Sequence, residues 1–211
     1  MEFRTIKEDG QVQEEIKKSR FICHIKRVTT EDEAREFINT IKKEHYKATH
    51  NCSAFILGER SEMKRSSDDG EPSGTAGVPM LGVLGNHQLT NVCAVVTRYF
   101  GGIKLGAGGL IRAYAGSVAL AIKEIGSVHI KEQLGLRLTL SYSQYQELPN
   151  FLKAKQLQEQ DTAFTDQIQT TIFVDKDDKD SVIESLIELF NGKIDIVEQG
   201  LREVEVPISS S

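Results

Sequence analysis

A strand that is apolar almost from end to end, followed by a glycine loop and an apolar helix, limits most strongly how this chain can fold. Residues Val92–Tyr99 have the composition of a central strand that is covered on both faces. The helix expected at residues 110–124 is apolar almost all round, so it must be heavily buried, and Gly126 is placed to end it. The stretch therefore predicts an α+β domain in which a sheet packs against helices.

Apolar spacing and turn residues predict the rest of this domain. The clearest further element is a helix after Thr30, which suits an N-cap and precedes three acidic residues at the positive end of the helix dipole. The other elements expected before residue 130 are strands at 18–28, 48–57 and 63–69 and a short helix that Ser73 or Thr75 caps.

After about residue 130 the pattern starts again and gives the order β-α-β-β-α-β, which is the ferredoxin-like arrangement. The expected elements are a strand at 134–140, a helix from Ser141 or Ser143 to 152 with Pro149 inside it, strands at 156–164 and 167–174, a helix at 177–190 and a last strand or pair of strands at 194–206. Two domains are therefore predicted, at residues 1–130 and 131–211.

The formal net charge of −5 hides an asymmetry between these two parts. Residues 1–130 hold 18 Lys and Arg against 16 Asp and Glu, and residues 131–211 hold 8 against 15, which gives +2 and −7. An acidic chain has no general basic coat for nucleic acid. An anionic partner must therefore bind a local patch in the first half.

Cysteine usage and hydropathy favour a cytoplasmic protein. Cys23, Cys52 and Cys93 lie far apart and match no metal-binding spacing, so buried reduced thiols and no metal site are expected. The polar start does not resemble a secretory signal, and no apolar run approaches the roughly 20 residues of a membrane-spanning helix. Nothing resembles a coiled coil, so a monomer is the default expectation.

An acid-free window separates Glu71 from Glu124: the 52 residues between them contain no Asp or Glu. At the average of 31 acids in 211 residues, this window would hold seven or eight. Burial alone would exclude cations as well as anions, yet Arg98, Lys104 and Arg112 remain. The window favours an anion-binding face, although a buried strand and helix with a few cations that reach water is the alternative.

The glycine loop lies inside this window and leads to the start of a helix, where unpaired amides and the helix dipole favour anions. Arg98, Lys104 and Arg112 can converge there on one phosphate. The loop matches neither the P-loop nor the dinucleotide motif, because Ala107 and Ile111 stand where these need Lys and Gly. The glycines can equally serve close packing of the turn. The residues predicted to bind phosphate or RNA are Arg98, Gly101, Gly102, Lys104, Gly106, Gly108, Gly109 and Arg112.

A second candidate site is the acidic turn that contains Asp68, Asp69 and Glu71. Paired carboxylates can hold Mg²⁺ or act as acid and base. Turns rich in Asp, Gly and Pro also occur for backbone reasons alone. No nucleophile motif accompanies them, so no catalytic residue is assigned.

Three segments carry a resemblance to a known family. They are KSRF at residues 18–21, SSDDGEPSGTAG at 66–77 and VVTRYFGGIKLGAGGL at 95–110. These segments resemble the signature stretches of the YigZ/IMPACT family, bacterial two-domain members included. The resemblance implies a first domain like the second domain of ribosomal protein S5 and a second like the C-terminal domain of elongation factor G. It also implies a role in the regulation of translation, and it brings no enzymatic activity or cofactor.

The leading hypothesis is a non-enzymatic RNA- or ribosome-binding protein, with a translation-factor protein as a further partner. Its competitor is an enzyme that acts on a small phosphorylated molecule, with the glycine loop as phosphate site and the acidic turn as metal ligands or base. A scaffold that binds only protein is the third hypothesis.

Overall fold

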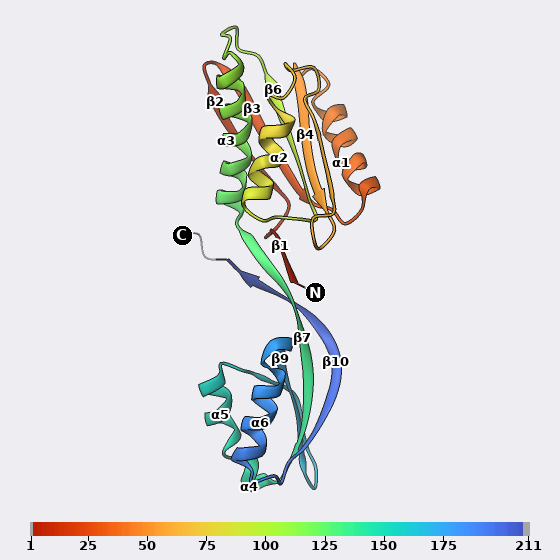
Figure 1. Ribbon diagram of the computed structural model, residues 1–211, viewed down its shortest axis with the longest axis vertical. Coiled ribbons are helices and arrows are strands. Elements are labelled where there is room, and N and C mark those ends of the chain that lie inside the picture. Colours follow the sequence, from red (N-terminus) through yellow and green to blue (C-terminus); the bar gives the residue numbers. More distant parts are fainter. Residues whose placement is uncertain (1, 209–211) are drawn as a thin grey trace. The chain divides into compact units, whose positions relative to one another are not determined.

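The computed structural model describes residues 2–208, and the chain forms two compact units (Figure 1). The first runs to Ile130 and includes the segment that begins at Glu205, and the second is Lys131–Val204. The α+β, two-domain organisation expected from the sequence is confirmed. The second domain was expected to extend to the C-terminus, but the segment from Glu205 belongs to the first unit. There Ile208 N donates to Ser127 O.

The first unit is built on a five-stranded sheet in which neighbouring strands are antiparallel. β6 lies at its centre, as the apolar run predicted. In spatial order the strands are β2 (Gly10–Ile16), β3 (Ser19–Arg27), β6 (Val92–Tyr99), β4 (His50–Leu57) and β5 (Met63–Ser67).

Helices cover both faces of this sheet (Figure 1). On one face α1 (Glu31–Glu44) packs on Phe55 and Val95, and on the other α2 (Gly77–Asn86) and α3 (Ala107–Ile125) pack on Ala54 and Val96. Successive residues of β4 and β6 thus point into different cores, because side chains alternate along a strand.

The helix ends agree with the sequence in two cases and differ in one. Thr30 Oγ1 accepts the N–H of Glu33 at the start of α1, and Gly126, with a φ of 85°, ends α3. The expectation that Ser73 or Thr75 caps α2 was wrong. Ala76 occupies that position without a side-chain hydrogen bond, and Thr75 donates to Pro72 O instead.

Two strands near the N-terminus were not expected, β1 (Glu2–Ile6) and β2. β2 has the sequence GQVQEEI and lies at the edge of the sheet, where Val12 is its one buried residue. An edge strand with a single buried side chain lacks the apolar alternation that identifies a strand.

The second unit has the ferredoxin-like order of elements, with the sheet arranged β10-β7-β9-β8. Pro149 divides the predicted helix into α4 and α5, and Ser141 forms a capping box with Gln144. Its elements are β7 (Ser127–Leu140, which begins in the first unit), α4 (Tyr142–Tyr145), α5 (Leu148–Lys155), β8 (Glu159–Phe164), β9 (Ile168–Asp175), a 3₁₀ turn (Lys176–Asp178), α6 (Lys179–Leu189) and β10 (Asp195–Pro207).

No helix among residues 2–208 combines the length and apolar character needed to span a membrane.

Candidate functional site

The segments that carry the family resemblance meet at one end of the sheet in the first unit. Register fixes this, because Arg20 lies opposite Tyr99 and Arg98 lies opposite His50. The turn between β2 and β3, the start of β4 and the glycine loop after β6 are therefore neighbours.

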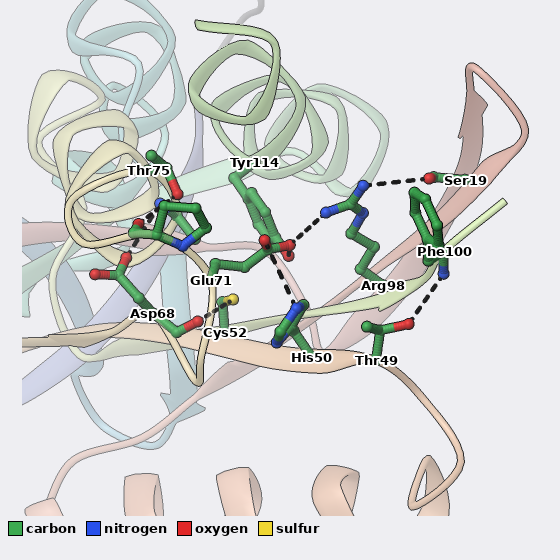
Figure 2. Close-up of polar contacts among 12 residues, drawn as sticks. Ser19, Thr49, His50, Cys52, Asp68, Glu71, Thr75, Arg98, Phe100 and Tyr114 are labelled. Carbon is green, nitrogen blue, oxygen red and sulfur yellow. Dashed lines mark hydrogen bonds and ion pairs between the residues drawn. The ribbon is translucent and has the colours of Figure 1, made fainter. Parts of the chain in front are cut away.

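A buried ion pair joins two of these segments (Figure 2). Arg98 Nη1 donates to Glu71 Oε1 over 2.7 Å, and the residues are 5% and 8% exposed. Arg98 Nη2 reaches Ser19 Oγ at 3.4 Å, and His50 Nε2 lies 3.7 Å from Glu71 Oε2. Breaking such a pair leaves an uncompensated buried charge, so the pair fixes the acidic turn to the end of β6.

Tyr114 and Cys52 extend this network into the core (Figure 2). Tyr114 Oη donates to Glu71 Oε1 at 2.6 Å, and burial, together with Cys52 and Glu71 as neighbours, raises the pKa of Tyr114. Cys52 Sγ donates to Asp68 O, and burial raises the pKa of its thiol to about 12. A thiol with that pKa is not a nucleophile at neutral pH.

All three cysteines are buried free thiols, as the sequence predicted. Burial raises the pKa of Cys23, and it raises that of Cys93 to about 12. The cysteines therefore contribute packing rather than chemistry.

The carboxylate of Asp68 in the acidic turn accepts backbone N–H groups at the start of α2. Asp68 accepts N–H groups from Gly74, Ala76 and Gly77 at 2.8, 3.1 and 2.8 Å. Burial alone would raise the pKa of Asp68, but these N–H donors hold it below its usual value. The carboxylate is thus the cap of α2, in place of Ser73 or Thr75.

Both carboxylate oxygens of Asp69 are committed to internal partners as well. Asp69 Oδ1 binds Lys42 Nζ at 2.6 Å, and its Oδ2 accepts the N–H of Asn51. Across residues 2–208 no group of three or more His, Cys, Asp or Glu is placed to hold a metal ion. The hypothesis of metal ligands in this turn therefore lacks the geometry it needs.

Arg98 differs from the sequence expectation because it is not part of an exposed basic face. Its charge is paired with Glu71, and its Nε is buried without a hydrogen-bond partner among residues 2–208. Lys104 and Arg112 are exposed. Arg98 and Lys104 line one pocket, and Arg112 is not among its lining residues.

That pocket, called the loop pocket here, has a volume of about 410 Å³. Its walls are largely apolar, and His50, Glu71 and Arg98 supply polar groups. The lining residues are Thr49, His50, Glu71, Pro72, Arg98, Phe100, Lys104, Leu105, Gly106, Ala107 and Leu110.

The start of α3 opens on the loop pocket. Gly106 is its N-cap residue with a φ of 74°, no side chain caps it, and its first turn holds no acid. Gly101 has a packing role, because a Cβ there would lie 1.8 Å from Lys18 O. The binding role predicted for Gly101, Gly102, Lys104, Gly106, Gly108, Gly109 and Arg112 stays a prediction.

A second group of cations at this end was not singled out from the sequence. Lys17 and Lys18 form the two-residue hairpin tip between β2 and β3, with φ values of 46° and 64°. Arg20 follows, with its guanidinium 4.4 Å from the centre of the Tyr99 ring. The sequence contains the two adjacent lysines between Ile16 and Ser19. They indicate a basic hairpin tip only when β2 is known to be a strand.

Comparison with known proteins follows the same division of the chain. Residues 17–122 match the model of the Impact N-terminal domain, and residues 138–193 match that of a domain of unknown function, DUF1949. Within the first match lie the hairpin tip, the acidic turn and the glycine loop.

Relatives and a solved structure match over nearly the whole chain. The IMPACT family member YvyE of Bacillus subtilis is 46% identical over 97% of this chain and 94% of its own length. An IMPACT family member of Haemophilus influenzae is 37% identical over 86% of this chain and 89% of its own. A crystal structure described as a hypothetical protein is 29% identical, with a TM-score of 0.60 over 93% of this chain and 96% of that one. This chain belongs to the IMPACT family.

Proposed function

We propose that this protein is a non-enzymatic RNA- or ribosome-binding protein that takes part in the regulation of translation. The observation that carries the proposal is the gathering of exposed Lys17, Lys18, Arg20 and Lys104 at one end of the sheet. Glu71 lies at the centre of that end, but its charge is buried and paired with Arg98, so it does not offset these cations. Clustered exposed Lys and Arg are the electrostatic footprint of a phosphate-backbone partner.

The conformation of the hairpin tip supports this proposal. A two-residue turn with positive φ at both positions favours Asn-Gly, and non-glycine residues there cost of order 1 kcal/mol each. Here both positions are lysine. Because the two lysines destabilise the turn, we infer that their charges serve a function rather than the stability of the fold.

The link to translation rests on membership of the IMPACT family and on the role that the family resemblance implies. The alternative is an enzyme that acts on a small phosphorylated molecule. The loop pocket favours that alternative, since its volume suits a small ligand. The enzyme hypothesis is disfavoured because it needs Asp68 and Asp69 as metal ligands or base, and both carboxylates bind internal partners instead.

The test is co-sedimentation with ribosomes from cell lysate across a salt series. The wild type is compared with Lys18→Glu/Lys104→Glu, which changes two exposed lysines at the site. Arg98 is left in place because its loss would destabilise the fold. The expected result is salt-sensitive association that is weaker in the double variant, whose slope of log affinity against log salt is shallower by roughly 1.4 for two single-strand phosphate contacts.

The matched control is Arg60→Glu/Lys64→Glu. Both residues are exposed, and they lie at the other end of the same sheet, where Lys64 is opposite Ile56. Each double variant lowers the net charge by 4 from −5, so a general charge effect would weaken both equally. Equal loss in the two variants, or association independent of salt, would count against the proposal.

A further inference from the structure

We propose that the loop pocket binds one nucleotide, with its base between apolar walls and its phosphate at the start of α3. The shared ligand chemistry is a planar base joined to one phosphate, either as a free nucleotide or as an unpaired residue of an RNA strand. The RNA form rests on the proposed function, and the free form does not.

The base site is the apolar part of the loop pocket, around Phe100. The Phe100 side chain is 47% exposed although it lines a pocket, so one ring face is available to a ligand. The backbone of Phe100 is anchored, because Phe100 N donates to Thr49 Oγ1 at 3.1 Å, and the Arg98 guanidinium lies 5.5 Å from the ring centre. A fixed aromatic face is the usual platform on which proteins stack single bases.

Two residues that line the same pocket, Glu71 and Arg98, carry polar atoms with unused hydrogen-bonding capacity. Glu71 Oε1 already accepts from Arg98 and Tyr114, whereas Oε2 has His50 Nε2 at 3.7 Å, beyond hydrogen-bond distance. Arg98 Nε is a buried donor without a partner among residues 2–208. A carboxylate acceptor beside an arginine donor can read the edge of a base, which presents donors and acceptors together.

The phosphate site combines Lys104 with the uncapped start of α3. Lys104 is exposed and lines the pocket with Gly106 and Ala107. The first amides of this 19-residue helix receive no side-chain cap, and no acid stands in its first turn. Free amides, the positive end of the dipole and a lysine together bind one phosphate.

The size of the pocket restricts what enters it. A volume of about 410 Å³ lies near the lower end of the roughly 300–1,000 Å³ of small-molecule sites. One nucleotide fits that range. A base inside a duplex cannot enter, because it is stacked and its edge is paired. The proposal therefore separates single-stranded from double-stranded RNA.

The experiment titrates the full-length protein with AMP, GMP, CMP and UMP, and with a single-stranded octamer RNA and its duplex, by calorimetry at fixed low salt. The variants are Phe100→Ala and Ala107→Glu. The second places a carboxylate at the phosphate site, where it suits the helix dipole and leaves folding intact. Its matched control is Ile111→Glu, an exposed position on the same helix that is not a lining residue. Thermal melts verify that each variant is folded.

We expect a nucleotide or the single strand to bind, and Phe100→Ala to weaken that binding at least about fivefold, the lower limit for one base stacked on an aromatic ring. Ala107→Glu should weaken it further than Ile111→Glu does. Binding of the octamer with this dependence identifies the RNA form. Binding of a nucleotide alone identifies the free form, and the co-sedimentation test then decides the proposed function separately. The pocket proposal is overturned if no nucleotide binds and RNA binding is unchanged in both pocket variants. It is also overturned if no nucleotide binds and the single strand and the duplex bind equally. Either result leaves the proposed function standing.

Discussion

The two helices that share one face of the sheet begin in opposite ways. The start of α2 is neutralised within the chain, since Asp68, nine residues before the first residue of the helix, accepts the N–H groups of Gly74, Ala76 and Gly77. The start of α3 has a glycine N-cap, no capping side chain and no acid in its first turn. Both helices pack on the same core.

This difference indicates that Asp68 and Glu71 of the signature segments have structural roles. Asp68 does for α2 what a bound anion would do for α3, because both supply negative charge to unpaired amides. The Glu71–Arg98 pair fixes the two segments to each other. Four changes test this comparison, and they follow in order of expected effect on the free energy of unfolding.

Replacing Arg98 by Met should have the largest effect. It leaves the Glu71 carboxylate buried without its cation, which costs about 3–5 kcal/mol. Urea unfolding measures the change. The double variant Glu71→Gln/Arg98→Met should recover part of the loss, because the uncompensated charge is gone. A loss below about 1 kcal/mol in the single variant would show that the pair does not hold the two segments.

Removing the cap of α2 should have the next largest effect. Asp68→Ala should destabilise the protein by about 2 kcal/mol, the upper part of the range for an N-cap, because three N–H donors lose their acceptor. The native pKa of Asp68 lies below its ordinary value of 3.8, so this stabilisation is present above that value and is lost as pH falls through the native pKa. Unfolding from pH 7 to pH 2 should therefore bring wild type and Asp68→Ala together at the acid end.

Changing the hairpin tip should stabilise the fold. Lys17→Asn/Lys18→Gly places the residues that the turn prefers and should raise the unfolding free energy by about 1 kcal/mol. The same variant should weaken RNA binding, because two site cations are lost. A variant that is more stable and binds less cannot owe its loss of binding to unfolding. Unchanged binding would remove the hairpin tip from the site.

Giving α3 an acid of its own should have the smallest effect on folding. Ala107→Glu makes the start of α3 more like that of α2 and should stabilise it by about 0.3–1 kcal/mol at low salt. Ala107→Lys is the matched opposite and should destabilise it by a similar amount. Calorimetric melts at two salt concentrations separate this electrostatic effect from a change in helix propensity, which salt does not screen.

The sequence predicted those elements whose residues follow a local pattern. The apolar run of β6, the cap of α1 at Thr30 and the glycine end of α3 were confirmed. The elements of the second unit were confirmed in type and order, but β7 begins at Ser127 rather than at 134, and the first helix is divided into α4 and α5. Each depends on neighbours within a few positions along the chain, where periodicity and capping rules apply.

The internal contacts of the site were not predictable in this way. Glu71 meets Arg98 and Tyr114 across 27 and 43 residues, and neither spacing follows from a motif. Asp68 was predicted as a functional carboxylate because its chemistry fits that role. Only the fold shows that its partners are the backbone N–H groups of Gly74, Ala76 and Gly77. The acid-free window is visible in the sequence, but the pairing of Arg98 is not, because its partner Glu71 is the acid at the edge of that window.

The distances along the chain that separate contacting residues have a consequence for synthesis. Gly101 donates to Ser19 across 82 residues, and Tyr114 reaches Glu71 from the middle of α3. Contacts so far apart close long loops, and they form only after the intervening chain has been made. A nascent chain that ends before α3 has the lysines and the acidic turn but no assembled pocket. The loop pocket is therefore completed only after α3 has been made, late in the synthesis of the first unit.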